Sequence, residues 1–120
     1  MRSLFQGRIV YVRDPVSDPQ GNNPKENRPF VVISPQEVID AKGEVLLVGI
    51  SKSQETKAEL AVELPHGYQS KTKLRVPCFA VCNWLINRSR TDFDVGDGYI
   101  KPKQLKEILE KSEGHSPLED

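Results

Sequence analysis

The chain has 120 residues, of which 37% are hydrophobic and 28% charged, a composition typical of one folded domain and unlike that of a disordered chain. Lysine and arginine (17) balance aspartate and glutamate (17), so any nucleic-acid binding must come from a local patch and not from net charge. No stretch approaches the ~20 apolar residues of a membrane-spanning helix, and Met1–Gly7 lack the apolar core of a secretion signal. We therefore expect a cytoplasmic protein that does not associate with a membrane.

The first quarter of the chain predicts two strands separated by a long loop. Apolar and polar residues alternate over Gly7–Arg13, which indicates a strand. The segment Asp14–Asn27 is rich in proline, glycine and asparagine, and loops of this length inside a compact domain often carry function. Phe30–Ile33 is a short apolar, β-branched run, which predicts a buried strand.

A short helix is expected next. Ser34 and Glu37 have the spacing of a capping box, Pro35 suits the first helical position, and Gly43 suits the end of the helix.

The remainder predicts further strands, a turn and a terminal helix. The expected strands are Val45–Ile50, Glu59–Leu64, Leu74–Trp84 and a brief Tyr99–Ile100. Aspartate and glycine in Asp92–Gly98 predict a turn. A helix should begin at Pro102, with Leu105, Ile108 and Leu109 on one face. Together these elements predict a mainly β (α+β) fold, a small barrel or twisted sheet with one helix packed against it. Residues 1–112 should form one domain, followed by a frayed acidic tail at 113–120.

The two cysteines, Cys78 and Cys82, are expected to be buried free thiols. On one strand they would stand about 13 Å apart, beyond the roughly 7 Å between Cα atoms that a disulfide spans. Two thiols at this spacing, without a histidine cluster, also make a poor zinc site. No metal and no cofactor are predicted.

Basic residues suggest a phosphate-binding patch. Lys71, Lys73 and Arg75 alternate, so on a strand they share one face. Lys52, Lys57, Arg88 and Arg90 are expected on turns nearby in the chain. Such a patch contacts phosphates independently of sequence; the alternative is an ordinary solvated surface. Trp84 and Tyr68 are candidates for stacking on bases, and Trp84 equally fits a core position.

Several short sequence features follow one another along the chain in a characteristic order. They are the strand opening at Gly7, Arg28-Pro29 before a Val/Ile strand, Ser51 after the third strand, Cys82-Asn83-Trp84, and Gly98-x-Ile100 followed by Leu105 and Ile108. In this order, from Gly7 to about Lys111, the chain resembles the MazF/PemK family of toxin ribonucleases. The resemblance implies an SH3-like small barrel of five to six strands with a C-terminal amphipathic helix. It also implies a homodimer that cleaves single-stranded RNA without a metal and is neutralised by an antitoxin.

The resemblance implies that Arg28 and Ser51 are catalytic and hold the scissile phosphate. A guanidinium offers paired donors to the phosphate oxygens, and a hydroxyl adds another; such donors contribute ~3–4 kcal/mol each where charge develops. The expected RNA contacts are Lys52, Ser53, Lys71, Lys73, Arg75 and Asn83. From the residues alone, Arg28 fits a surface ion pair with Glu26 or Asp14 as well.

Two positions depart from the family pattern. Some members carry an arginine and an aspartate as acid and base where this chain has Val81 and Asn83, neither of which exchanges a proton at neutral pH. Proton transfer would then rest on Arg28, Ser51 and water. The alternative is a catalytically weak or inactive module of the same fold that binds nucleic acid (RNA or DNA) or a protein. A third hypothesis, a CcdB-like gyrase poison, rests on fold analogy.

Overall fold

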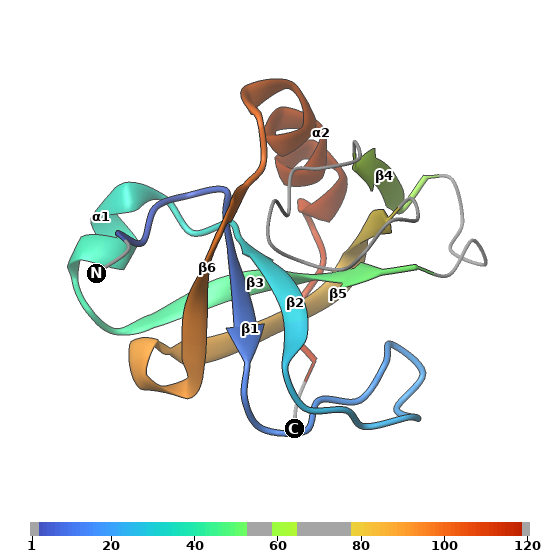
Figure 1. Cartoon of the computed structure of the whole chain (residues 1–120). Coiled ribbons are helices and arrows are strands. Elements are labelled where there is room, and N and C mark those ends of the chain that lie inside the picture. The colour runs from blue at the N-terminus through green and yellow to red at the C-terminus, as the bar shows by residue number, and fades with distance from the viewer. Residues whose placement is uncertain (1–2, 53–58, 65–77, 119–120) are drawn as a thin grey trace.

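In the computed structural model, which describes residues 3–52, 59–64 and 78–118, the strands form one antiparallel sheet (Figure 1). In chain order the elements are β1 (Arg8–Val12), β2 (Arg28–Val32), α1 (Gln36–Asp40), β3 (Glu44–Ser51), β4 (Ala61–Leu64), β5 (Cys78–Ser89), the 3-10 turn η1 (Arg90–Asp92), β6 (Phe93–Tyr99) and α2 (Pro102–Ser112). The six strands lie in the order β4-β5-β3-β2-β1-β6. The mainly β class and the C-terminal helix are therefore as predicted. The sheet is not closed into a continuous barrel, because β4 and β6 are its two edges among the described residues.

Each face of the sheet carries its own apolar cluster, because side chains alternate along every strand. Val31 of β2 belongs to the first cluster, and its neighbours Phe30 and Val32 belong to the second. Helix α2 covers the first cluster with the fully buried Ile108, and Leu105 and Leu109 pack beside it, as the helical spacing predicts. The second cluster lies beneath the β1–β2 connection, through the buried Val16.

A bulge in β5 places the single tryptophan in the second cluster. Val48 pairs with Leu85 but Gly49 pairs with Val81, so the β5 residues between these partners have no counterpart in β3. Trp84 is only 1% exposed and packs edge-on against Phe30, with ring centroids 5.1 Å apart. A Cβ atom on Gly49 would lie 2.0 Å from Cε3 of Trp84. Gly49 thus leaves the space that the indole fills, and Trp84 is a core residue.

Two predictions for the second half of the chain are wrong, one in the end of a strand and one in the type of element. Strand β5 runs on to Ser89, five residues past the predicted end at Trp84, while residues 74–77 lie outside the described ranges. The predicted turn at Asp92–Gly98 is strand β6, which pairs with β1 and includes Tyr99. Here pairing overrides the turn-forming composition: a Cβ on Gly96 would lie 2.7 Å from Cε2 of Tyr11, so glycine admits the neighbouring tyrosine.

The predicted capping box of the first helix is also wrong. Ser34 is buried, and its Oγ accepts a hydrogen bond of 2.8 Å from the backbone N–H of Leu46 on β3. The N-cap is Pro35, without a side-chain capping bond, and α1 ends at Asp40. Lys42, with φ 62°, takes the left-handed position that the sequence suggested for Gly43. A long-range contact has recruited the serine that the local pattern assigned to the cap.

Cys78 and Cys82 are buried thiols that form no disulfide, as predicted. Burial raises the pKa of the Cys82 thiol to about 11, against an opposing effect of Lys111, and burial raises the pKa of Cys78 as well. Thiolates are the reactive form of cysteine, so both side chains should be chemically quiet in the native protein.

We expect neither cysteine to react with a disulfide reagent such as DTNB at pH 8 in the folded protein. With a pKa of about 11, about a thousandth of Cys82 is ionised at that pH. Unfolding in guanidinium chloride should release both thiols within seconds, and the absorbance of the released thionitrobenzoate measures them. Rapid reaction of either thiol under native conditions would contradict the burial described here.

None of the described helices is long and apolar enough to cross a membrane. After α2 the chain turns back to the sheet, where the backbone N–H of Leu118 donates a 2.7 Å hydrogen bond to the carbonyl of Leu85 on β5.

Candidate functional site

The loop between β1 and β2 is folded against the sheet and has an ordered tip. Val16 is buried in the second cluster and forms an isolated bridge with Lys25. The Asp18 carboxylate accepts hydrogen bonds from the backbone N–H groups of Asn22 (2.9 Å) and Gln20 (3.0 Å) and from Nδ2 of Asn23 (3.1 Å). These bonds, the one from Asn22 above all, lower the pKa of Asp18, and the nearby Arg28 charge acts in the same direction. The loop therefore holds a defined shape close to Arg28.

Arg28, the first residue of β2, is held by this loop. Its Nε donates a 2.7 Å hydrogen bond to the carbonyl of Val16, and Nη2 donates to the carbonyl of Asn23. The guanidinium carbon lies 5.4 Å from the ring centroid of Trp84. These main-chain and aromatic contacts replace the ion pair with Glu26 or Asp14 that the sequence alone allowed. A guanidinium has five N–H donors, so a phosphate meeting Arg28 uses those that remain or displaces the loop.

Ser51, the last residue of β3, lies at the same end of the sheet as Arg28. The register of β2 and β3 pairs Phe30 with Gly49, so Arg28 and Ser51 each lie two residues beyond the same strand pair. The topology thus places the two predicted catalytic residues beyond one end of the β2–β3 ladder, from segments that are far apart in the sequence.

The residues predicted to bind RNA fall into two groups. Lys52 follows Ser51 and is exposed, and Asn83 lies half-buried in the β5 bulge. The Oδ1 atom of Asn83 is buried and has no hydrogen-bond partner. The others, Ser53, Lys71, Lys73 and Arg75, lie outside the described residues, as do Lys57 and Tyr68. Val81, the second departure from the family pattern, is buried in the second cluster.

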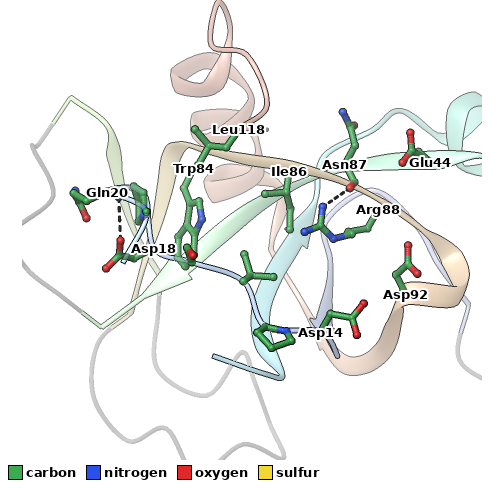
Figure 2. A pocket seen from close by; sticks show the side chains of 15 residues that line it. Asp14, Asp18, Gln20, Glu44, Trp84, Ile86, Asn87, Arg88, Asp92 and Leu118 are labelled. Carbon is green, nitrogen blue, oxygen red and sulfur yellow. Dashed lines mark hydrogen bonds between the residues drawn. The ribbon is translucent and has the colours of Figure 1, made fainter. Parts of the chain in front are cut away.

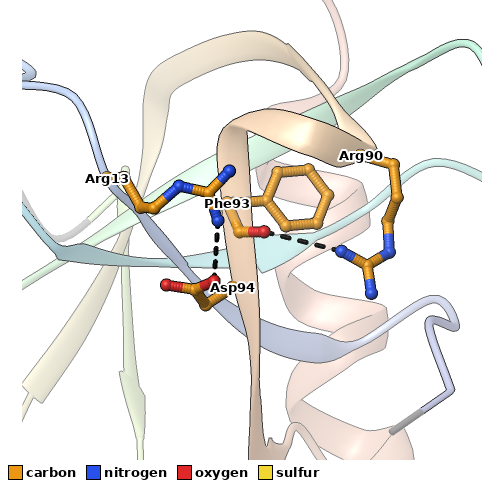
Figure 3. Close-up of polar contacts among 4 residues, drawn as sticks. All are labelled: Arg13, Arg90, Phe93 and Asp94. Carbon is orange, nitrogen blue, oxygen red and sulfur yellow. Dashed lines mark hydrogen bonds and ion pairs between the residues drawn. The ribbon is translucent and has the colours of Figure 1, made fainter. Parts of the chain in front are cut away.

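Arg88 and Arg90 lie far from Lys52, the one described lysine of the predicted patch. They lie on β5 and η1, not on turns near Ser51, and Glu44 at the far end of β3 pairs with Ser89. At 3.3 Å per residue, the length of β3 separates them from Ser51 by roughly 23 Å. Arg90 instead packs over Phe93 at 5.6 Å, in the corner where Arg13 pairs with Asp94 at 2.7 Å (Figure 3).

One feature was not predicted at all: an acidic cleft of about 880 Å³ between the β1–β2 loop and β5 (Figure 2). Its charged lining residues are Asp14, Asp18, Glu44, Asp92 and Arg88. Because they come from separate segments, no spacing in the sequence marks them as a group. Within the described ranges no three His, Cys, Asp or Glu side chains come close enough together to hold a metal ion.

An open six-stranded antiparallel sheet, a C-terminal helix on one face, and an arginine and a serine at adjoining strand ends define the class of fold and site. A family model described as "PemK-like, MazF-like toxin of type II toxin-antitoxin system" matches residues 5–112. The chain belongs to this family, as its sequence features suggested.

Solved structures with similar folds have low sequence identity to the chain. An "Endoribonuclease from Mycobacterial species" has a TM-score of 0.65 at 12% identity, covering 93% of this chain and 89% of that one. A MazE-MazF complex from Deinococcus radiodurans has a TM-score of 0.68 at 13% identity, covering 93% and 94%. An "Endoribonuclease in complex with its cognate antitoxin from Mycobacterial species" has a TM-score of 0.62 at 14% identity, covering 92% and 91%. At these identities the likeness shows the fold. A search of curated protein sequences gave no match.

Proposed function

We propose that this protein is a toxin endoribonuclease that cleaves single-stranded RNA without a metal and is neutralised by an antitoxin. The observation that carries the proposal is that the chain belongs to the MazF/PemK family and has Arg28 and Ser51 beyond the same end of the β2–β3 ladder. The names of the similar structures, an endoribonuclease and toxin–antitoxin complexes among them, support the same activity and partner.

The proposed reaction starts with attack of the ribose 2′-oxygen on the adjacent phosphorus. The new O–P bond forms as the bond to the 5′-oxygen breaks, which leaves a 2′,3′-cyclic phosphate and a 5′-hydroxyl. Negative charge grows on the non-bridging oxygens, where the N–H donors of Arg28 and the hydroxyl of Ser51 stabilise it. Water accepts the proton of the 2′-hydroxyl and supplies one to the leaving oxygen, since Asn83 and Val81 cannot exchange one.

Contacts to the rest of the strand are proposed for Lys52, Ser53, Lys71, Lys73, Arg75 and Asn83. Lysine and arginine contact phosphates without reading sequence. The buried Oδ1 of Asn83, which lacks a partner within the described part of the chain, is an acceptor that a ribose or base donor satisfies on binding.

We expect purified protein to cut a long single-stranded RNA in excess EDTA and to leave 2′,3′-cyclic phosphate ends, identified by mass spectrometry of the fragments. Asn83→Asp should raise the rate by supplying the missing base. Products with 3′-hydroxyl ends, or activity that requires magnesium, would contradict attack by the 2′-hydroxyl as written.

A homodimer is proposed as the cytoplasmic form of the protein. Edge strand β6 carries Tyr99, which is 51% exposed and packs against Phe5 at 6.2 Å, and an exposed edge of this kind favours association. Sedimentation at micromolar concentration should therefore give twice the mass of one chain, and Tyr99→Lys should shift the equilibrium towards monomer. A monomer at tens of micromolar would contradict the proposal.

The alternative, a module of this fold that binds nucleic acid or protein without cleaving it, is favoured by two observations. Two Arg28 donors are engaged by carbonyls of the loop, and no carboxylate stands at Asn83. RNA binding without cleavage of any sequence in a diverse pool would select this alternative. The gyrase-poison hypothesis has no specific contact behind it, and a supercoiling assay with DNA gyrase tests it directly.

A further inference from the structure

The acidic cleft adjoins Arg28, which contacts two of its lining residues, Val16 and Trp84, but the charged side chains that line the cleft itself are mostly acidic. Its lining brings together the carboxylates of Asp14, Asp18, Glu44 and Asp92 with a single guanidinium, that of Arg88 (Figure 2). Arg88 donates to the backbone carbonyl of Asn87 at 2.7 Å. Phosphates entering the cleft would face a net negative surface, so a polyanion is disfavoured there and a polycation is favoured.

The cleft lies beside β5, whose outer side is only partly paired. Strand β4 pairs with β5 from Cys78 to Val81, and its last bond to β5 is the 2.8 Å contact from Cys82 N–H to the Leu60 carbonyl. Beyond this bond no described strand flanks β5, so this stretch is a free edge among the described residues, met there only by Leu118. The carbonyl of Leu85 points away from β3, because it accepts a hydrogen bond from the N–H of Leu118. Asn87 comes two residues later on the same strand, so its main-chain N–H and C=O point in the same direction.

An unsatisfied donor lines the same cleft. Trp84 is only 1% exposed, and its Nε1 atom is buried without a hydrogen-bond partner within the described part of the chain. Figure 2 shows the indole among the cleft residues, with its nitrogen on the edge of the ring turned towards them. A buried N–H without an acceptor costs about 1–3 kcal/mol. A peptide carbonyl entering the cleft would relieve that cost.

We propose that this cleft binds an extended, basic segment of a partner protein, which pairs with the free edge of β5 and sets lysine or arginine side chains among the carboxylates. The Leu118–Leu85 bond shows that a main-chain group on this side of β5 accepts a hydrogen bond from another segment. Among the described residues the carboxylates are too dispersed to hold one metal ion. They reach the cleft from the β1–β2 loop, the start of β3 and η1, so several basic side chains of one segment can meet them. The inference does not depend on RNA cleavage, and the failure of either leaves the other standing.

Calorimetric titration of the whole protein tests the proposal, with the fluorescence of Trp84, the only tryptophan, reporting where binding occurs. The probes are a ten-residue peptide alternating valine with lysine or arginine, its counterpart with glutamate at the basic positions, and a ten-nucleotide RNA. We expect micromolar binding of the basic peptide with a change in Trp84 emission, and at least ten-fold weaker binding of the acidic peptide. A heat of peptide binding without a change in Trp84 fluorescence would place the binding site elsewhere and overturn the proposal. Absence of any peptide binding would overturn it as well.

Matched variants separate the cleft from general charge. The double variant Asp14→Asn/Glu44→Gln removes two exposed carboxylates of the cleft and should lower the affinity for the basic peptide at least ten-fold. The control Glu37→Gln/Glu110→Gln removes two exposed carboxylates from the helices and should leave its affinity unchanged. Equal effects of the two variant pairs on the affinity for the basic peptide would refute the proposal, as would RNA binding that the Asp14→Asn/Glu44→Gln variant weakens by the same factor as peptide binding.

Main-chain pairing has its own test. Asn87→Pro removes one outward N–H from an edge position that tolerates proline, whereas Asn87→Ala keeps it. Weaker peptide binding by the proline variant alone is expected, with circular dichroism confirming that both variants are folded. Equal affinity of the two folded variants would overturn strand addition as the mode of binding.

Discussion

Replacing Arg28 by alanine should lower the rate of RNA cleavage by about 10²–10³-fold, the usual effect of removing one donor from a site where negative charge develops. Arg28→Lys should recover little of the loss, because an ammonium lacks the planar fork that meets two phosphate oxygens. Initial rates on a fluorogenic RNA, measured at saturating and at limiting substrate, give the effect on kcat and on kcat/KM.

The matched control is Arg13→Ala, at the other end of the same loop. Arg13 forms an exposed ion pair with Asp94, with side chains 46% and 65% exposed, so its loss removes one positive charge without touching the proposed site. Exposed pairs contribute about 0–1 kcal/mol to stability. Arg28→Ala also removes the bonds to Val16 and Asn23, so circular dichroism must show that the variant is folded. Full activity of folded Arg28→Ala would refute the proposed site.

Gly49→Ala should lower the free energy of unfolding by about 3 kcal/mol, the upper end of the usual cost of overpacking a core. The added methyl would lie 2.0 Å from Cε3 of Trp84, and the indole is confined by Phe30 at 5.1 Å. Urea denaturation followed by far-ultraviolet circular dichroism measures the change.

Gly43→Ala is the matched control, because a Cβ at that position would meet no atom within 4 Å. Its effect should stay within about 0.5 kcal/mol. Combining Gly49→Ala with Trp84→Phe should cost less than the sum of the single changes, since the smaller ring leaves room for the methyl. A neutral Gly49→Ala would show that the bulge adjusts freely, contrary to the packing described here.

Local sequence patterns predicted those elements whose structure depends on local burial. The apolar runs at Phe30–Ile33 and Val45–Ile50 lie within or beside β2 and β3, because alternating or continuous burial leaves its period in the sequence. Strand β6 was missed because its glycines and aspartates favour turns, while its conformation comes from pairing with β1. Ser34 was misassigned because its partner, Leu46, lies on a neighbouring strand.

The candidate site divides in the same way. Arg28 and Ser51 were proposed from residue types that the family motif fixes along the chain, and both lie beyond the Phe30–Gly49 pair of the β2–β3 ladder. The carbonyls that hold Arg28 belong to backbone atoms of an irregular loop, and no side-chain pattern encodes them. The acidic cleft joins residues that no periodicity connects, so only the folded chain shows it.

The hydrogen bond from Leu118 to Leu85 makes the C-terminal segment an intramolecular competitor for the free edge of β5. A tethered competitor acts at an effective concentration in the millimolar range when its linker is short and flexible. The apparent affinity of any incoming strand is then reduced by the fraction of molecules in which the segment is bound. The length and sequence of the few residues after α2 would therefore set the concentration at which a partner begins to occupy that edge, without changing a single contact in the complex itself.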